Sequence, residues 1–164
     1  MNPYKGVDNL LKIVKRCPFV QFDVVGRVDP LVDDLVCELE SQPNVKLNKN
    51  YVTDDEMKSY FMNADWVILP YNTASQSGVI IDSYKYSRPV IAFDVGAVSE
   101  QIEDYVSGYL VEADNIDIFC NTLKYCNSMS FEEYQFICHG AYQYGLEKYS
   151  SEYAKNKFYE MIRL

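Results

Sequence analysis

The spacing of apolar residues switches repeatedly along the chain, and this alternation constrains the fold more than any other feature. Helical spacing at Val7, Leu10, Leu11 and Val14 ends at Pro18 and gives way to a strand-like run. Strand-like runs occupy residues 19–25, 45–47, 66–69, 89–93 and 108–111, and helical stretches lie near 31–39, 53–61, 78–86, 99–102 and from 130 onward. Apolar strands separated by amphipathic helices indicate a parallel sheet covered on both faces. We therefore predict a doubly wound, Rossmann-like, three-layer α/β/α domain with extra C-terminal helices.

The order of these segments carries one anomaly. A doubly wound sheet ordinarily begins with a strand, whereas this chain runs from a short loop directly into the helical stretch at Val7. The length of 164 residues suits one domain. We therefore expect residues 1–164 to form a single domain that lacks its first strand.

Composition excludes several classes of function. The formal net charge of −9 would repel nucleic acid, so we expect no nucleic-acid partner. The five cysteines form no Cys-x-x-Cys pair and the chain has one histidine, so we expect reduced thiols and no bound metal. No apolar run is long enough to span a bilayer, and the first residues do not resemble a signal peptide, which favours the cytoplasm.

The loop at residues 70–78 is the most informative candidate site. Ligands of open α/β sheets bind beyond the carboxyl ends of the strands, where helices begin. This loop follows an apolar strand, is rich in small polar residues and opens a helix at Gly78. Free backbone N–H groups and the helix dipole make such a place suited to phosphate. Asp82 follows one helical turn later, within reach of a sugar hydroxyl. The plainer interpretation is a surface loop with a helix-surface aspartate.

Two other junctions fall at the same predicted edge of the sheet. Lys5 precedes Gly6 and the first helix, where it would supply a cation. Gly26 and Arg27 follow the first visible strand. The plainer interpretations are a solvated lysine and a glycine that serves only a tight turn. No nucleophile elbow, Walker loop or Gly-x-Gly-x-x-Gly motif occurs, so a nicotinamide dehydrogenase has no support.

Taken in order, several segments resemble the C-terminal half of GT-B glycosyltransferases of the group 1, family 4-like, retaining type. They are residues 5–11 (KGVDNLL), 64–70 (ADWVILP), 76–82 (QSGVIID), 88–92 (RPVIA), 94–97 (DVGA) and 107–111 (SGYLV). The resemblance covers about residues 3–125. It implies a domain that holds a nucleotide-diphosphate sugar, UDP- or GDP-linked, without a metal ion or other cofactor.

The resemblance also implies a role for individual residues. Lys5, beside Gly6, would contact the diphosphate and stabilise charge on the leaving group, and the amides of Gly78 and Val79 would hold the same phosphates. Asp82 stands where the family has a ribose-binding glutamate, and its side chain is one methylene shorter. From their place after the first visible strand, Gly26 and Arg27 are also predicted to belong to the donor site.

This sequence departs from the family pattern at two places. Ala74 stands at the family's first glutamate, so Gln76 or Ser77 would take over the sugar contact. The family arginine that partners the lysine would fall before Met1, as would the first strand and the N-terminal acceptor-binding domain.

The expected function is the donor-binding half of a hexosyltransferase that acts on a glycan or lipid-linked acceptor, as in polysaccharide biosynthesis. The chain alone would show no turnover, and the complete protein would be cytoplasmic or peripheral at the inner membrane. The alternative is a non-catalytic, nucleotide-binding regulatory or assembly module. A receiver-like signalling domain would need clustered aspartates at the first strand end, and this sequence does not have them.

The last part of the chain is rich in aromatic residues. If the missing domain leaves them exposed, they would form an apolar surface through which the chain dimerises. They are Tyr142, Tyr144, Tyr149, Tyr153, Phe158 and Tyr159.

Overall fold

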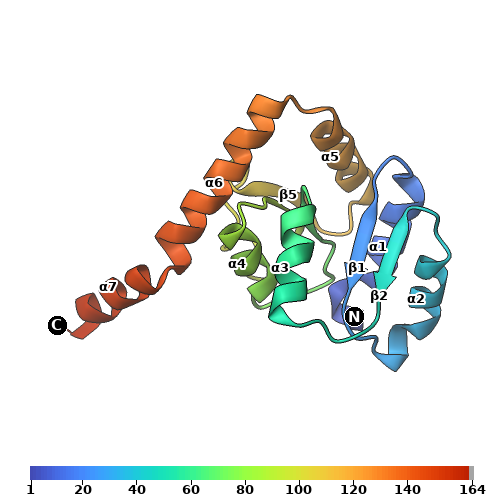
Figure 1. Ribbon diagram of the computed structural model, residues 1–164, viewed down its shortest axis with the longest axis horizontal. Helices are drawn as coiled ribbons and strands as arrows, with labels where there is room; N and C mark the ends of the chain where they lie inside the picture. Colours follow the sequence, from blue (N-terminus) through green and yellow to red (C-terminus); the bar gives the residue numbers. More distant parts are fainter. Residues whose placement is uncertain (163–164) are drawn as a thin grey trace.

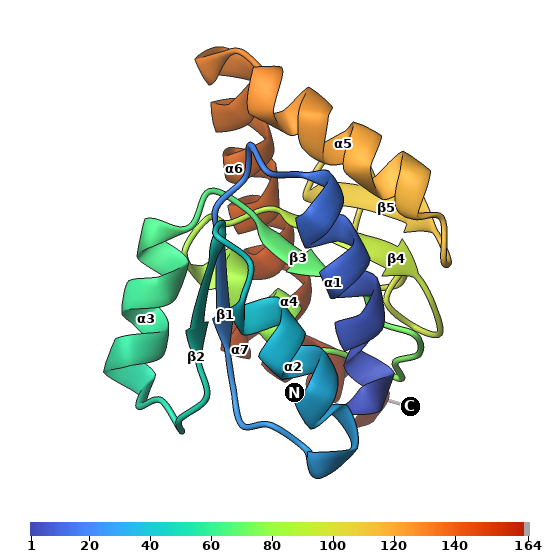
Figure 2. The ribbon, with the colours of Figure 1, turned by 90° about the vertical axis from the view of Figure 1, so that its right-hand side faces the viewer.

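The computed structural model describes residues 1–162 and confirms an α/β architecture with parallel strands between helices. The strands are β1 (Phe22–Val25), β2 (Val45–Asn48), β3 (Val67–Leu69), β4 (Val90–Asp94) and β5 (Gly108–Glu112). The helices are α1 (Val7–Arg16), α2 (Asp33–Glu40), α3 (Asp54–Asn63), α4 (Gly78–Lys85), α5 (Ile116–Ser128), α6 (Phe131–Tyr149) and α7 (Ser151–Ile162). Figures 1 and 2 show helices on both sides of the strands.

The strands form two parallel sheets rather than one continuous sheet. One sheet pairs β1 with β2, and the other has the order β3-β4-β5. Within residues 1–162, β1 and β3 form no hydrogen-bonded pair with each other or through another strand. The two sheets nevertheless share one core, because Phe22 and Val24 of β1 belong to the same buried cluster as Ile91 and Phe93 of β4. Side-chain packing therefore joins two sheets that backbone hydrogen bonds do not.

Burial differs between the two sheets. Residues 90–93 of β4 are 0% exposed, as expected for a strand covered on both faces. In β1, by contrast, buried Phe22 and Val24 alternate with exposed Asp23. The smaller sheet therefore packs one face against α1 and leaves polar side chains on the other, so the prediction of strands that are apolar on both faces holds only for the larger sheet.

Local sequence signals set where two of the helices begin. Thr53 and Ser130 each form a capping box, with Glu56 and Glu133 respectively, and so begin α3 and α6 as their spacing predicts. The expected helix at 99–102 is wrong, because this segment forms turns. A helix of four residues closes too few hydrogen bonds to offset its nucleation, and the Gln101 side chain is instead bonded to the backbone of Ser77.

The C-terminal helices extend away from the rest of the domain. α6 packs along α4, and α7 projects away from the other elements (Figure 1). No residue of α7 is buried. Tyr142, Phe158 and Tyr159 are exposed, whereas Tyr144 and Tyr149 pack against the core around Tyr84. Within residues 1–162, no helix combines the length and apolarity that crossing a bilayer requires.

Candidate functional site

Three chain segments meet at the carboxyl edge of the larger sheet. The carbonyl of Tyr4 accepts a hydrogen bond from the Asn72 N–H at 2.9 Å, which joins the start of the chain to the loop after β3. On the other side of the loop, the Ala97 N–H donates to the Ala74 carbonyl at 3.1 Å. The loop at residues 70–78 is therefore held between residues 3–6 and residues 94–97, as expected for the wall of a binding site.

Two glycines allow these close approaches. Gly6 (φ 65°) and Gly96 (φ 56°) both lie in the left-handed region, which disfavours any side chain. A Cβ on Gly6 would lie 1.7 Å from the Pro70 carbonyl oxygen, and one on Gly96 would lie 1.9 Å from that of Ala74. The loop can approach both neighbouring segments this closely only because neither position carries a Cβ.

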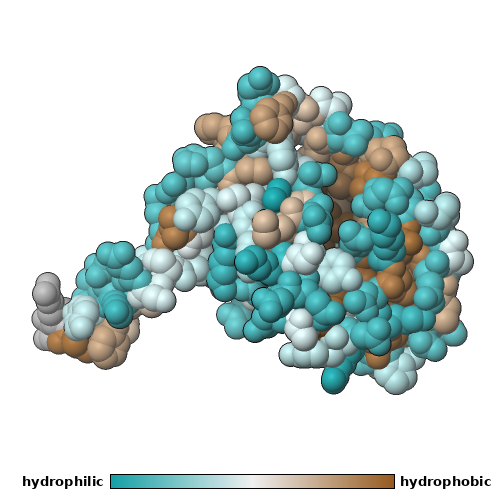
Figure 3. All heavy atoms as spheres, in the orientation of Figure 1, coloured by the Kyte–Doolittle hydropathy of each residue, from teal (hydrophilic) through white to brown (hydrophobic). Residues whose placement is uncertain are grey.

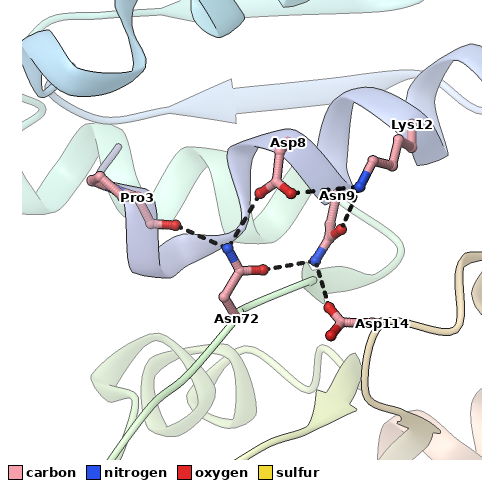
Figure 4. Close-up of polar contacts among 6 residues, drawn as sticks. All are labelled: Pro3, Asp8, Asn9, Lys12, Asn72 and Asp114. Carbon is pink, nitrogen blue, oxygen red and sulfur yellow. Dashed lines mark hydrogen bonds and ion pairs between the residues drawn. The ribbon is translucent and has the colours of Figure 1, made fainter.

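Polar side chains pin the loop from the side of α1. The buried Asn9 amide donates to the Asn72 Oδ1 at 2.8 Å and to the Asp114 Oδ1 at 3.4 Å. The Asn72 Nδ2 in turn donates to the Pro3 carbonyl and to Asp8 (Figure 4). Asp8 also forms an ion pair with Lys12, so its negative charge is partly balanced next to the loop.

Gln101 pins the other end of the loop, where α4 begins. Its Oε1 accepts from the Ser77 N–H at 2.7 Å, and its Nε2 donates to the Ser77 carbonyl at 3.3 Å. The Gln101 carbonyl accepts from the Tyr84 hydroxyl, whose pKa is raised by burial. Both Gln101 and Ser77 are buried. The orientation of the first turn of α4 is therefore set by a side chain 24 residues downstream.

The two helices that begin at this edge have uncapped N-termini. Side chains cap α3, α5 and α6, from Thr53, Asn115 and Ser130. In the described residues, neither α1, preceded by Gly6, nor α4, preceded by Ser77, has a side-chain cap. The first N–H groups of a helix have no acceptor within it and carry partial positive charge. At this edge of the sheet, the N-termini of α1 and α4 therefore both have first-turn N–H groups that no side chain caps.

The N-terminus of α4 is exposed at Gly78. A Cβ built on Gly78 would meet nothing within 4 Å, and Gly78 is exposed. Val79 is partly buried and Gln76 is exposed on the loop. A ligand can therefore reach the backbone at the predicted phosphate position.

Lys5 lies next to the loop at residues 70–78. Its Nζ is 5.9 Å from the centre of the Tyr71 ring, and no ion pair within residues 1–162 includes it. Tyr71 is itself buried, and its pKa is raised by that burial. The structure thus places Lys5 and Gly6 beside the loop that leads into α4.

Other predicted residues are less closely connected to this edge. Asp82 forms an ion pair with Lys85 at 2.7 Å on the surface of α4, so its carboxylate is already partnered. Arg27 lies over the ring of Tyr51, 5.5 Å from its centre, after β2. Gly26 ends β1, and an added Cβ there would lie 3.8 Å from the Met1 nitrogen. Gly26 and Arg27 therefore follow the smaller sheet, and their recorded contacts are with Asn48 and Tyr51 after β1 and β2.

Sequence reasoning missed three residues that position the loop. Asn9, Asn72 and Gln101 are polar, and single polar residues on a helix or in a turn give no local signal of burial. The burial of Asn9 and Gln101, and the hydrogen bonds of all three residues, arise from contacts across 63 and 24 residues. No group of three or more His, Cys, Asp or Glu side chains within residues 1–162 is placed to hold a metal ion.

The chain is similar in sequence to known glycosyltransferases. Residues 1–127 match the family described as glycosyl transferases group 1. An uncharacterized glycosyltransferase of Methanocaldococcus jannaschii is 26% identical over 121 residues, which are 69% of this chain and 32% of that protein. An uncharacterized 41.2 kDa protein in the cps region of Klebsiella pneumoniae is 28% identical over 113 residues, 68% of this chain and 30% of that protein. The chain thus spans about a third of these relatives.

Solved structures share the fold over almost the whole chain. TarM is 26% identical with a TM-score of 0.79, covering 98% of this chain and 33% of TarM. Anabaena HepE in complex with UDP-glucose is 20% identical with a TM-score of 0.83, covering 99% of this chain and 46% of HepE. The C-terminal domain of the Francisella tularensis group 1 protein LpcC is 20% identical with a TM-score of 0.79, covering 92% and 83% of the two chains. The chain therefore has the fold of a GT-B C-terminal domain and belongs to the group 1 glycosyl transferases.

Proposed function

We propose that this chain binds a nucleotide-diphosphate sugar at the loop of residues 70–78, with the diphosphate against the N-terminus of α4. The observation that carries the proposal is the convergence of two uncapped helix N-termini with the Lys5 side chain at one edge. Amides that are held in place before the ligand arrives stabilise an anion without reorganising. Gln101 supplies that order by holding Ser77 on both its N–H and its carbonyl.

The Lys5 ammonium adds a mobile positive charge to these fixed dipoles. In the proposed complex, it lies against the phosphate oxygens and stabilises the charge that develops on the departing nucleotide diphosphate. The open space at Gly78 leaves room for phosphate oxygens next to the backbone. Binding of UDP-glucose by HepE, a protein of the same fold, supports a nucleotide sugar as the ligand class.

Transfer of a hexosyl group to an acceptor is proposed for a complete protein rather than for these residues alone. This chain spans 30–32% of the length of its curated relatives. An acceptor needs a second wall facing the loop, and we expect binding without turnover when that wall is absent. Asp82 reaches the ribose in this proposal only by leaving Lys85, so it contributes less than Lys5.

Isothermal titration of the chain with UDP, GDP and UDP-glucose tests the binding proposal. A saturable, salt-sensitive interaction with at least one ligand is expected, and the Lys5→Met variant should weaken it about tenfold, or about 1.4 kcal/mol. Lys15→Met is the matched control, because Lys15 lies at the other end of α1 in an ion pair with Glu38. Equal loss in both variants, or no binding by any of the ligands, would refute the assignment.

A non-catalytic module is the second candidate, because Lys5 is the one residue to which this proposal gives a role in the chemical step. Sugar transfer distinguishes the two. The donors bound by this chain should be consumed when the chain is part of a protein with an acceptor-binding domain, and Lys5→Met in that protein should lower kcat more than it raises KM. Donor binding without any consumption of the donor by that protein would favour the non-catalytic role, and unchanged transfer in the Lys5 variant would refute the role given to Lys5.

A further inference from the structure

A second concave region lies at the amino end of the larger sheet, away from the loop at residues 70–78. A cavity of about 420 Å³ lies between the start of β5, the end of α5 and the start of α6. Figure 1 shows α5 and α6 joined above β5 and diverging on its two sides. Aromatic rings and two glutamates line this cavity, from Tyr105, Tyr109, Tyr125, Phe136, Glu132 and Glu133. We call this region the aromatic cavity.

Two tyrosine rings of the aromatic cavity stand at right angles to a third, buried one. The centre of the Tyr109 ring lies 5.5 Å from that of Tyr105 and 6.0 Å from that of Tyr125, with angles of 88° and 83° between the ring planes. Tyr109 is buried, whereas Tyr105 and Tyr125 are 71% and 50% exposed. The rings therefore surround the space from different sides and do not form one flat platform. The electron-rich face of such a ring attracts a cation.

The turn before β5 fixes the position of Tyr105. Its φ of 63° lies in the left-handed region, which residues with a bulky side chain rarely adopt. The Tyr105 N–H donates to the Gly108 carbonyl at 2.9 Å, and the hydroxyl of buried Ser107 accepts from the Glu103 N–H in the same turn. The Tyr105 ring is therefore held at the aromatic cavity by a hydrogen-bonded turn that tolerates an unfavourable backbone conformation.

Apolar surface extends from the aromatic cavity over the start of α6. Phe131 and Phe136 are largely exposed there, and Ile137 is buried behind them. Figure 3 shows apolar atoms among hydrophilic ones at this end of the molecule. The thioether of partly buried Met129 also lines the cavity. These groups contact methyl groups well and offer few hydrogen bonds, so a ligand needs apolar surface of its own.

The charged side chains that line the aromatic cavity are negative. Within residues 1–162, neither Glu132 nor Glu133 forms an ion pair. Hydrogen bonds from the backbone and the hydroxyl of Ser130 lower the pKa of Glu133 and hold its carboxylate in place, so it is ionised at neutral pH. No Lys, Arg or His side chain of the described residues lines the cavity. The negative charge there has no cationic partner among the lining side chains.

The two helix ends at the aromatic cavity do not offset this charge. α5 ends at Ser128 without a basic residue in its last turn, so the partial negative charge of its last carbonyls is not balanced by a side chain of that turn. At the start of α6, the positive end of the helix is already countered by the capping box and by Glu132 and Glu133. Aromatic faces and uncompensated negative charge thus meet at one place.

We propose that the aromatic cavity binds a small organic cation with a methylated ammonium group, of the choline type. A quaternary ammonium has no N–H group, so aromatic and apolar walls can contact its methyl groups without leaving a hydrogen bond unmade. The ring faces and the two carboxylates stabilise its charge. A primary ammonium loses more hydration and finds fewer acceptors among these walls. The cavity is large enough for a whole molecule of this kind.

NMR titration of the 164-residue chain with three probes tests the proposal. The probes are choline, neohexanol, which is a neutral alcohol with carbon in place of the choline nitrogen, and ethanolamine, which has a primary ammonium group. At constant ionic strength, choline should shift the amide signals of Tyr105, Tyr109 and Phe136 in a saturable manner. Neohexanol should bind about tenfold more weakly, because it lacks the charge that the rings and carboxylates attract. Ethanolamine should bind about threefold more weakly than choline, because it lacks the methyl groups.

Two variants separate the contribution of the rings from that of the charge. Tyr125→Leu keeps an apolar side chain and removes a ring, and Glu132→Gln keeps the shape and removes a charge. Both side chains are exposed, so both variants should fold. Each should weaken choline binding about threefold. Tyr159→Leu and Glu152→Gln, at exposed positions on α7, are the matched controls and should leave the affinity unchanged.

Four results would overturn the proposal. The first is the absence of saturable shifts with choline at the aromatic cavity. The second is equal affinity for choline and neohexanol, which would show an apolar groove without preference for a cation. The third is ethanolamine binding as tightly as choline. The fourth is an equal loss of affinity in the cavity variants and in the controls on α7.

Discussion

Replacing Gly6 by alanine should destabilise the domain because Gly6 sits where the chain start meets the loop after β3. Its φ of 65° costs a residue with a side chain about 1–2 kcal/mol. The new Cβ would lie 1.7 Å from the Pro70 oxygen, against about 3.4 Å for an ordinary contact, so one segment must move by more than 1 Å. That movement loosens the hydrogen bonds of Asn72 to Tyr4 and Asn9, at about 1 kcal/mol each.

The sum is about 3–4 kcal/mol, a large share of the 5–15 kcal/mol that stabilises a typical domain. Urea unfolding followed by circular dichroism measures it as a lower midpoint at an unchanged slope. Gly78→Ala is the matched control, because a Cβ there meets nothing within 4 Å and Gly78 has no positive φ. Alanine in that helix should leave stability unchanged or raise it by up to about 1 kcal/mol. A loss below about 1 kcal/mol for Gly6→Ala, or equal losses in the two variants, would refute the reasoning.

Three further predictions follow from other contacts. Gln101→Leu leaves two buried groups of Ser77 unpaired, so unfolding free energy should fall by about 2–4 kcal/mol in urea titrations; no change would refute the pinning role. Exposed Cys37 should react with a thiol reagent at pH 8 within minutes. Burial raises the pKa of Cys17 to about 12, so Cys17 should react only when the protein unfolds. Equal reaction rates of the two thiols would contradict this prediction. Hydrogen bonds from Thr53 lower the pKa of Glu56. The resulting contribution to stability is present above the unfolded pKa of about 4.3 and is lost as the pH falls through the lower folded pKa. The difference in Tm between the wild type and Thr53→Ala should therefore narrow from pH 7 to pH 3. A constant difference in Tm would argue against the cap.

The sequence alone determined the class of fold and most element positions, because those depend on local patterns. The apolar periods predicted β4 and β5, and the capping boxes at Thr53 and Ser130 predicted where α3 and α6 begin. The resemblance predicts that Lys5 and Gly78 belong to one donor site, and this stays a prediction. Each of these signals resides within a few neighbouring residues, so no knowledge of distant contacts was needed.

Only the tertiary structure decided how these elements join. The division into two sheets depends on which backbone edges meet, and apolar spacing within a strand carries no such information. The order of the loop at residues 70–78 depends on Gln101, in a segment whose sequence favours a helix but whose side chain is bonded to Ser77 instead. In both cases the deciding interaction joins groups that are distant in the sequence and are brought together by packing. The local propensity of a segment does not encode which distant groups it will contact.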